Sequence, residues 1–311
     1  MADMPAALVL VVGDANPDLV LRGDVVPRFG QAEQLLDDAA LLVGGSAAIT
    51  AHGFARLDRP VTLLAAVGDD DFAGPLLAQL AAAGVRLDHV IHRPGQRTGL
   101  TVVLSTQDDR AILTHLGTIP TLTAAELRRA VAACEPAHVH VSSLFLQPTL
   151  ARALPAVLAE IRASGRTVSL DTNDDPAGRW QGVTELLPHV DVLLPNRREA
   201  LALTGASDLP AAARKLAGHG PLVVVKDGDA GALACSPDGT LTSVDALPRE
   251  PVDTTGAGDT FDAAFLDGWL DGLPLPHCLD RAVRAGAAAV GAVGGTAGQP
   301  TARELPTPER R

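Results

Sequence analysis

The stretch Asp253-Thr-Thr-Gly-Ala-Gly-Asp259 leads into an amphipathic segment that runs to Leu270. Its two glycines allow the backbone to turn sharply and to come close to a ligand. A helix that begins here would point unpaired N–H groups and the positive end of its dipole at whatever lies in front of it. We therefore expect an anion hole, which suits the negative charge of a transferring phosphoryl group.

Asp259 lies at the mouth of this expected anion hole. A carboxylate at that place could accept the proton of an attacking hydroxyl, as phosphoryl transfer requires. The alternative is an acid in the first turn of a helix that only interacts with the dipole, and a lone GxGD string would favour that alternative. The complete string, between a strand and a long helix, favours the catalytic interpretation.

Apolar runs of strand length alternate with amphipathic segments along the whole chain. We expect strands at Leu8–Val12, Val61–Val67, His138–Val141, Thr167–Leu170, Val190–Leu194 and Leu222–Val225. Helices are expected at Ala47–Leu57, Phe72–Ala83, Thr123–Ala133, Leu150–Ala163 and Ala257–Leu270. This alternation predicts an α/β fold, a three-layer sandwich with a mainly parallel central sheet. Ligands of such sheets gather at the carboxyl ends of the strands.

Two regions interrupt the alternation. Asp18–Val43 has the pattern of short strands and turns, and Thr98–His115 has the pattern of a hairpin with a polar turn at Gln107–Arg110. Together they predict a small β-sheet lid beside the main sheet, with segments at approximately 16–45 and 95–116. The open edges of such a lid invite covering by another chain.

The amino-acid composition argues against several classes of binding partner. Of the 311 residues 47% are hydrophobic, which supplies a sizeable core, and we expect one domain over residues 1–311. The formal charge of −12 opposes binding to nucleic acid or to an anionic membrane. No apolar run approaches the roughly 20 residues that cross a bilayer, and MADMPAALVLVVGD lacks the basic region of a secretory signal.

Cys134, Cys235 and Cys278 are widely spaced and form no metal-binding pattern. They predict free thiols in a reducing cytoplasm. No GxxxxGK[ST] string occurs, which argues against a P-loop enzyme, and the absence of GxGxxG after a strand argues against a Rossmann dehydrogenase.

Taken together, the motifs resemble the ribokinase-like, or PfkB-type, family of carbohydrate and nucleoside kinases. Asp253–Asp259 matches the family's C-terminal signature D-T-x-G-A-G-D throughout, and Gly44–Leu57 with Val67–Gly74 resembles its N-terminal signature. The resemblance extends over nearly the whole chain, and it implies that Asp259 is the catalytic base. The implied anion hole is formed by the amides of Gly256, Ala257 and Gly258.

Asn196 and Glu199 follow the expected strand Val190–Leu194 and are three residues apart, so they share a face on a first helical turn. The spacing alone predicts a helix-capping box equally well. The resemblance matches the pair to the family's N-x-x-E motif, which organises Mg²⁺ near the nucleotide phosphates. It implies that Asn196 binds nucleotide and that Glu199 holds Mg²⁺ through water, as suits an ion that keeps several waters.

Two further strand ends resemble nucleotide-binding elements of the family. Asp171-Thr-Asn173 is similar to its D-x-N element, although a solvated acidic turn is an equal alternative. Lys226 ends a strand and precedes Gly228 and Gly231, which match a turn that lies along the nucleotide. Gly228 should allow close backbone approach. Lys226 could reach a phosphate as a mobile cation, although most lysines at strand ends are simply solvated.

The resemblance also implies a substrate site at the end of the first strand. Asn16 and Asp18 match the family's G-x-x-N-x-D, whose aspartate binds sugar hydroxyls, and a carboxylate can accept from two vicinal hydroxyls. The alternative is an Asx-turn. Ile49 stands where the family often has an asparagine, so one polar contact is lost. The remaining implied substrate residues are Gly44, Gly45 and Thr98.

The resemblance implies an enzyme that uses ATP and Mg²⁺ to phosphorylate a hydroxyl, expected to be CH₂OH, of a small sugar. A nucleoside kinase is the second hypothesis, and a non-catalytic regulator that binds sugar or nucleotide is the third. Asp253 and Thr255 match a family position that binds K⁺, so K⁺ activation is a further hypothesis. The family also implies a homodimer joined through the lid.

Overall fold

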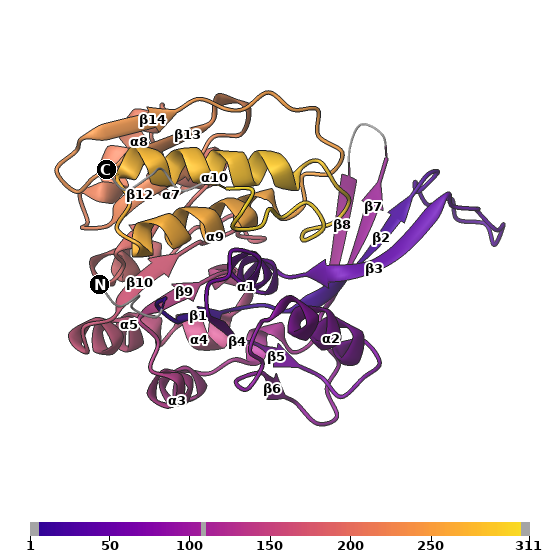
Figure 1. Cartoon of the computed structure of the whole chain (residues 1–311). Coiled ribbons are helices and arrows are strands. Elements are labelled where there is room, and N and C mark those ends of the chain that lie inside the picture. Colours follow the sequence, from indigo (N-terminus) through magenta and orange to yellow (C-terminus); the bar gives the residue numbers. More distant parts are fainter. Residues whose placement is uncertain (1–5, 107–109, 306–311) are drawn as a thin grey trace.

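The computed structural model describes residues 6–106 and 110–305. Figure 1 shows a central sheet with helices on both faces and a smaller sheet that projects from one end. The central sheet has eight strands in the order β14-β13-β12-β11-β10-β9-β1-β4. Neighbours from β4 to β12 pair in parallel, whereas β13 and β14 pair antiparallel. The predicted three-layer α/β sandwich is therefore confirmed.

The strands of the central sheet are short, and all except β14 are largely buried. They are β1 (Val9–Val12), β4 (Val61–Leu64), β9 (His138–Val141), β10 (Thr167–Leu170), β11 (Val192–Leu193), β12 (Leu222–Lys226), β13 (Ala232–Cys235) and β14 (Leu241–Val244). Continuous apolar strands of this kind need cover on both faces.

Two hydrophobic clusters lie on the two faces of this sheet. One face is covered by α1 (Ser46–Arg56), α2 (Ala73–Ala83), α9 (Ala257–Leu270) and α10 (Leu275–Ala289). The other face is covered by α3 (Ala124–Cys134), α4 (Pro148–Ala151), α5 (Leu154–Ala163), α6 (Val183–Leu186), α7 (Arg197–Thr204) and α8 (Leu209–Ala217). Among the residues described, no helix combines the length and the apolar character that a bilayer crossing requires.

Several predicted boundaries were wrong for identifiable reasons. The helix expected at Leu150–Ala163 is divided into α4 and α5, because Pro155 has no N–H to donate and fits only the first turn of α5. The strand expected at Val61–Val67 breaks after Leu64, and β5 (Ala66–Val67) leaves the sheet to pair with β6 (Ile91–His92). Helix α10 and the antiparallel strands β13 and β14 were not predicted.

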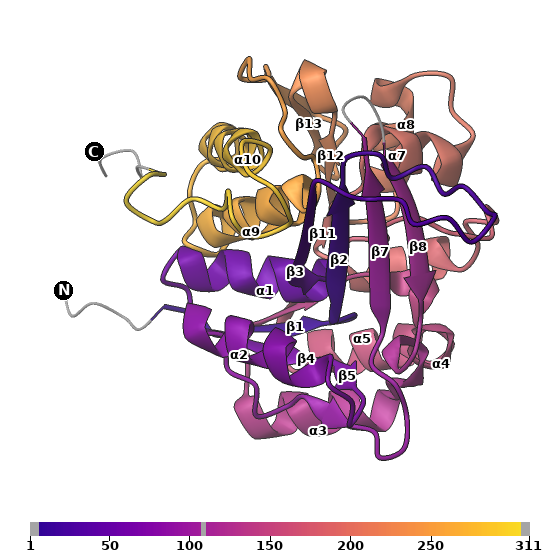
Figure 2. The same ribbon diagram turned by 90° about the vertical axis from the view of Figure 1, so that its right-hand side faces the viewer.

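The smaller sheet has the strand order β3-β2-β7-β8. Figure 2 shows its strands side by side: β2 (Asn16–Arg22), β3 (Asp38–Gly44), β7 (Leu100–Ser105) and β8 (Arg110–His115). The predicted lid sheet is therefore confirmed. Arg110 was expected in the turn of the hairpin but begins β8, and residues 107–109 of that turn lie outside the described residues.

A buried ion network fixes the C-terminal half of α9. The Asp267 carboxylate accepts a hydrogen bond from Arg59 Nε at 2.8 Å and another from Arg281 Nη2 at 2.8 Å. Arg281 also donates to the Leu305 carbonyl at 2.6 Å, and Arg59 donates to Asp271 at 2.6 Å. The network joins the start of β4, helix α9, helix α10 and the end of the described chain.

Replacing Asp267 by Ala leaves two buried guanidinium groups without their shared carboxylate. We expect Asp267→Ala to lower the free energy of unfolding by about 3–5 kcal/mol, as measured by urea denaturation. Asp271→Ala is the matched control, because the Asp271 side chain is 49% exposed, and it should cost less than about 1 kcal/mol. Equal losses in the two variants would contradict the importance assigned to Asp267.

Candidate active site

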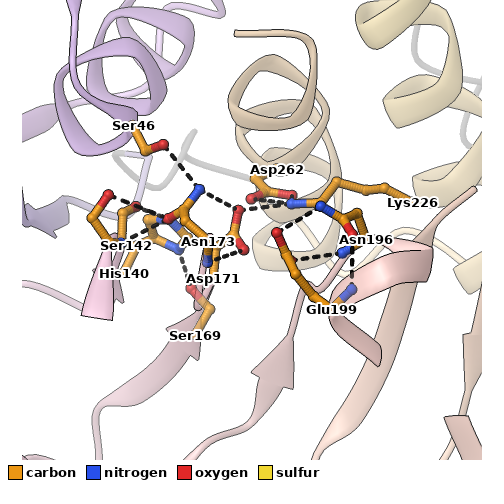
Figure 3. A network of polar contacts seen from close by, with 11 residues as sticks. Ser46, His140, Ser142, Ser169, Asp171, Asn173, Asn196, Glu199, Lys226 and Asp262 are labelled. Atoms are coloured by element: carbon orange, nitrogen blue, oxygen red, sulfur yellow. Dashed lines mark hydrogen bonds and ion pairs between the residues drawn. The ribbon is translucent and has the colours of Figure 1, made fainter. Parts of the chain in front are cut away.

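Polar side chains from neighbouring strands meet at the carboxyl edge of the central sheet. Asp171 follows β10, Asn196 follows β11 and Lys226 ends β12, while α9 begins opposite them. Figure 3 shows these side chains pointing toward one another. They line one end of a cavity of about 470 Å³. The structure therefore brings together the strand-end motifs that the sequence analysis selected.

This cavity has a polar end and an apolar end. The polar end is lined by Asp171, Asn173, Asn196, Glu199, Lys226 and Asp259. The apolar end is lined by Ala246, Leu247, Phe261, Val283 and Val290, from the segment after β14 and from α9 and α10. A cavity with apolar walls and a few convergent polar groups is typical of a small-molecule site.

Helix α9 begins at the polar end of the cavity. Gly256 is its N-cap, with a left-handed φ of 71°. A Cβ at Gly256 would lie 2.6 Å from the Cα of Gly295, so only glycine fits there. Ala257 and Gly258 line the cavity, and amides in the first turn of a helix lack an intrahelical acceptor. The Ala257 amide has only a long hydrogen bond, at 3.4 Å, to the Thr254 carbonyl. Two of the three residues expected to form the anion hole, Ala257 and Gly258, thus lie at the cavity wall, and ligand binding by the three amides stays a prediction.

Asp259 lies on the first turn of α9 and lines the same cavity. Burial, together with the negative charge of Asp171, raises its pKa to about 8. The Lys226 ammonium and a hydrogen bond with Ser46 act in the opposite direction and lower that pKa. A carboxyl group whose pKa lies near neutrality is suited to exchange protons with a ligand.

Lys226 is held by two carboxylates rather than free to move. Its Nζ donates to Asp171 Oδ2 at 2.7 Å and to both oxygens of Asp262 at 3.0 Å. Burial alone would lower the pKa of Lys226, but the charges of Asp171 and Asp262 raise it above its ordinary value. The expected mobile cation is therefore a fixed one, although it still lines the cavity.

Asp262 is a site residue that the sequence analysis missed. It is fully buried on α9, and burial raises its pKa well above the ordinary range although Lys226 lowers it. Asp262 follows Asp259 by three residues, so both project from one face of the helix. An acid within the apolar stretch Phe261–Phe265 was the available signal, since a charge in a buried helix face needs a partner.

Asn196 and Glu199 form the capping box that their spacing allowed. Asn196 Oδ1 accepts from the Glu199 amide at 3.0 Å, and Glu199 Oε2 accepts from the Asn196 amide at 2.9 Å. Both side chains also line the cavity, so capping and ligand binding are compatible. Burial and the charge of Asp171 raise the pKa of Glu199 to about 7.

The oxygen donors at this end of the cavity fit Mg²⁺, which prefers carboxylate, amide and water oxygens. The candidates are Asp171, Asn173 and Glu199. Within the described residues, no group of three or more His, Cys, Asp and Glu side chains is arranged to hold a metal ion. An ion bound here would therefore depend on phosphate oxygens and water for most of its ligands.

Asn173 connects the sheet to the start of α1. Its Nδ2 donates to Ser46 Oγ at 2.9 Å, and its Oδ1 accepts from the Ser143 amide at 2.7 Å. Behind it the polar network continues into the sheet, where His140 is hydrogen-bonded to Ser169 and Ser142. Burial lowers the pKa of His140 to about 4, so this histidine is neutral at pH 7.

Asn16 and Asp18 lie at the base of the lid, on β2. Asn16 Nδ2 donates to Asp18 Oδ1 at 3.0 Å and to Thr101 Oγ1 at 3.1 Å. Burial, together with the charge of Asp14, raises the pKa of Asp18 to about 7. Asp14 in turn lies close enough to Asp259 to raise the pKa of that residue. The predicted substrate carboxylate and the predicted base therefore belong to one electrostatic cluster.

Gly44 and Gly45 have a structural reason to be glycine that was not expected. A Cβ at Gly44 would lie 2.0 Å from Asp18 Oδ1, and a Cβ at Gly45 would lie 2.8 Å from the Asp14 carbonyl. Gly45 also has a φ of 84°, in the left-handed region. These glycines make room for the buried acids beside them, and their contact with a substrate stays a prediction.

Gly228 and Gly231 lie where the nucleotide-binding interpretation expects them. Both have positive φ, both line the cavity, and a Cβ at Gly231 would lie 2.1 Å from the Val244 carbonyl. A Cβ at Gly228 would meet open space, so the backbone of this turn is accessible to a ligand in the cavity.

The Thr98 hydroxyl is hydrogen-bonded within the protein, and the Ile49 side chain is packed in the core. The Thr98 hydroxyl donates to Asp70 Oδ1 at 2.6 Å and accepts from the Gly68 amide at 2.9 Å, which ties the lid to a neighbouring loop. Ile49 is buried and points at Gly295, where a Cβ would lie 2.4 Å from its Cδ1. Neither side chain offers a free group to a substrate in this structure.

Asp253 and Thr255 lie beside the first turn of α9 and bind each other. Asp253 Oδ1 accepts from the Thr255 amide at 2.9 Å and from Thr255 Oγ1 at 2.7 Å, while Oδ2 accepts from the Gly294 amide at 2.8 Å. Arg110 reaches this pair from the lid. Burial raises the pKa of Asp253, but these hydrogen bonds outweigh it and lower the pKa below its ordinary value.

Comparison with known proteins agrees with this geometry. The family model described as "pfkB family carbohydrate kinase" matches residues 6–302. The chain belongs to the pfkB family of carbohydrate kinases. It is therefore a carbohydrate kinase, a phosphotransferase that acts on an alcohol group, and the resemblance inferred from Asp253–Asp259 is confirmed.

Relatives of this carbohydrate kinase cover nearly its whole length. A ribokinase of Schizosaccharomyces pombe is 29% identical over 315 residues, which cover 96% of each chain. The ribokinase of Arabidopsis thaliana, solved with ribose and ATP, is 26% identical with a TM-score of 0.81, covering 97% of this chain and 98% of that one. The adenosine kinase of Sinorhizobium meliloti is also 26% identical, with a TM-score of 0.81 over 93% of this chain and 95% of that one.

Proposed function

We propose that this carbohydrate kinase transfers the γ-phosphoryl group of ATP to a CH₂OH group of a small sugar, with Asp259 as the base. The observation that carries the proposal is the position of Asp259. It lines the 470 Å³ cavity and is coupled electrostatically to Asp14, which lies beside Asp18 under the lid. An acid between a nucleotide-sized cavity and a cluster of hydroxyl-binding groups suits proton abstraction from an acceptor.

The nucleotide would occupy the cavity in a defined direction. Its base fits the apolar end near Val283 and Val290, and its phosphates fit the polar end near Asn196 and the α9 amides. Mg²⁺, when bound with ATP, would neutralise the phosphate oxygens. The complex of Arabidopsis ribokinase with ribose and ATP supports the same pairing of ligands here.

The acceptor would lie under the lid. Asp18 and Asn16 are buried polar groups at the base of β2, and they can hold hydroxyl groups that displace their present partners. Asp259 would accept the proton of the attacking hydroxyl while the amides at Gly256–Gly258 stabilise the charge of the transferring group. Closure of the lid excludes water, which would otherwise compete as the acceptor.

A nucleoside acceptor is the second candidate, and the similarity to an adenosine kinase supports it. Ile49 does not decide between the two acceptors, because its side chain packs against Gly295 rather than facing an acceptor. A non-catalytic regulator is the third candidate. A regulator without catalytic activity would not need an acid at Asp259 beside a helix N-terminus.

Asp259→Asn keeps the size of the side chain and removes its ability to accept a proton. We expect it to lower kcat by at least about a hundredfold while leaving the Kd for ATP within about threefold of the wild-type value. Turnover is followed by coupled ADP release over a panel of sugars, 2-keto-3-deoxy acids and nucleosides, and ATP binding by calorimetry. A near-normal rate in Asp259→Asn would show that another group is the base. ATP binding without turnover of any acceptor would favour the regulator.

The pH dependence follows from the pKa of Asp259, which burial and the charge of Asp171 raise to about 8. A base must be deprotonated to act, so kcat/KM should fall as the pH drops through about 8, by about tenfold per pH unit below it. Lys226→Gln removes a cation that lowers this pKa, so its midpoint should move upward. A value of kcat/KM that stays constant from about pH 6 to about pH 9 contradicts the assignment.

We propose further that two copies pair through the lid. Supporting this are exposed apolar side chains on the loop between β2 and β3 and on β8, namely Val26, Phe29, Leu35, Ile112 and Leu113. Light scattering after gel filtration should give twice the chain mass of 31.9 kDa. The double variant Phe29→Asp with Leu35→Asp should give 31.9 kDa. A wild-type monomer at micromolar concentration rejects the pairing.

A further inference from the structure

A side chain of the lid reaches the segment that leads into the anion hole. Arg110 is the first residue of β8, and its Nη1 donates to Thr255 Oγ1 at 2.7 Å and to Asp253 Oδ1 at 3.2 Å. The Arg110 side chain is 33% exposed and that of Asp253 is 13% exposed. The contact joins residues that are 143 positions apart in the sequence.

One oxygen of the Asp253 carboxylate, Oδ1, is fully occupied by hydrogen-bond donors in this arrangement. A carboxylate offers about four acceptor sites. Oδ1 takes the Thr255 amide, Thr255 Oγ1 and Arg110 Nη1, and Oδ2 takes the Gly294 amide. A K⁺ ion between Asp253 and Thr255 would therefore have to displace Arg110, because the guanidinium group already contributes a positive charge at Asp253 Oδ1 and Thr255 Oγ1.

We propose that Arg110 replaces a monovalent cation beside the anion hole and makes this kinase independent of K⁺. Its guanidinium neutralises Asp253 and holds Thr255, which immediately precedes Gly256. Arg110 is thus a positioning residue, since it acts on phosphoryl transfer through the amides that follow Thr255. This inference rests on the proposed function of those amides.

The surrounding packing supports a connection between the lid and the anion hole. Leu42 of β3 packs on Gly294, where a Cβ would lie 2.4 Å from Leu42 Cδ1. Gly295 lies against Gly256, where a Cβ would lie 2.6 Å from the Cα of Gly295. The lid thus contacts the Gly294–Gly295 segment with an apolar side chain and Asp253 with a charged one. A displaced lid would remove both contacts. The Arg110 guanidinium therefore reaches Asp253 only when the lid also covers the acceptor site.

The test compares wild type, Arg110→Ala and the control Arg22→Ala in KCl, in NaCl and in tetramethylammonium chloride at equal ionic strength. Arg22 is an exposed arginine of the same lid sheet, on β2. Wild type and Arg22→Ala should have the same kcat in the three salts within about twofold. Arg110→Ala should lose at least about tenfold in kcat without K⁺, and KCl or millimolar guanidinium should restore most of it.

A second measurement uses thermal unfolding without nucleotide or acceptor. KCl should raise the Tm of Arg110→Ala relative to NaCl, because the emptied position can then bind the ion. The Tm of wild type and of Arg22→Ala should be equal in the two salts.

Three results would overturn the proposal: a wild-type kcat that requires K⁺, an Arg110→Ala variant with a normal rate in NaCl, or a folded Arg110→Ala variant that neither K⁺ nor guanidinium rescues. If the wild type phosphorylates no acceptor, the proposed function fails. The salt dependence of Tm then still decides whether Arg110 occupies a cation position.

Discussion

The buried ion pairs of Lys226 hold the catalytic edge of this kinase together. The ammonium group joins Asp171, at the end of β10, to Asp262, on α9, at distances of 2.7 and 3.0 Å. Without it, the carboxylates of Asp171, Asp259 and Asp262 would face one another at low dielectric, where like charges repel strongly. The pair therefore fixes α9 against the sheet and limits how far the pKa of Asp259 rises. The Asp171 side of the cavity and the position of α9 both depend on these ion pairs.

Helix α9 is anchored at its other end by a different ion network. Asp267 binds Arg59 and Arg281 there, so the helix is tied to the sheet and to α10. A helix fixed along its length can present its first-turn amides without reorganising when a charged group arrives, and such preorganisation is the main source of electrostatic stabilisation in enzymes. The lid adds contacts to the segments beside the start of α9, through Leu42 on Gly294 and Arg110 on Thr255.

The candidate active site contains many acidic side chains, so a phosphate group can bind there only together with cations. Asp14, Asp18, Asp171, Glu199 and Asp259 lie near the place where a phosphate chain would bind, and burial acts to raise the pKa of each. The pKa is raised overall for four of them, whereas Lys226 and hydrogen bonds lower that of Asp171. A phosphate group added to this cluster requires positive charge from Lys226, from the α9 dipole and from a metal ion bound with the nucleotide. At Asp253, Arg110 supplies such charge from the chain itself.

The sequence by itself determined the α/β class, the lid sheet, the family and the position of the motif Asp253–Asp259, because these depend on local patterns: apolar runs, glycine spacing and an acid three residues into α9. It correctly placed Asp171, Asn196 and Lys226 at strand ends, and Glu199 on the helical turn that follows Asn196, since parallel strands bring their carboxyl ends to one edge. It did not reveal Asp262 as the partner of Lys226 or Arg110 as the partner of Asp253, 36 and 143 residues apart. Only the tertiary structure decided these pairings, because a buried charge is satisfied by whichever opposite charge the packing brings near, at any separation in the chain.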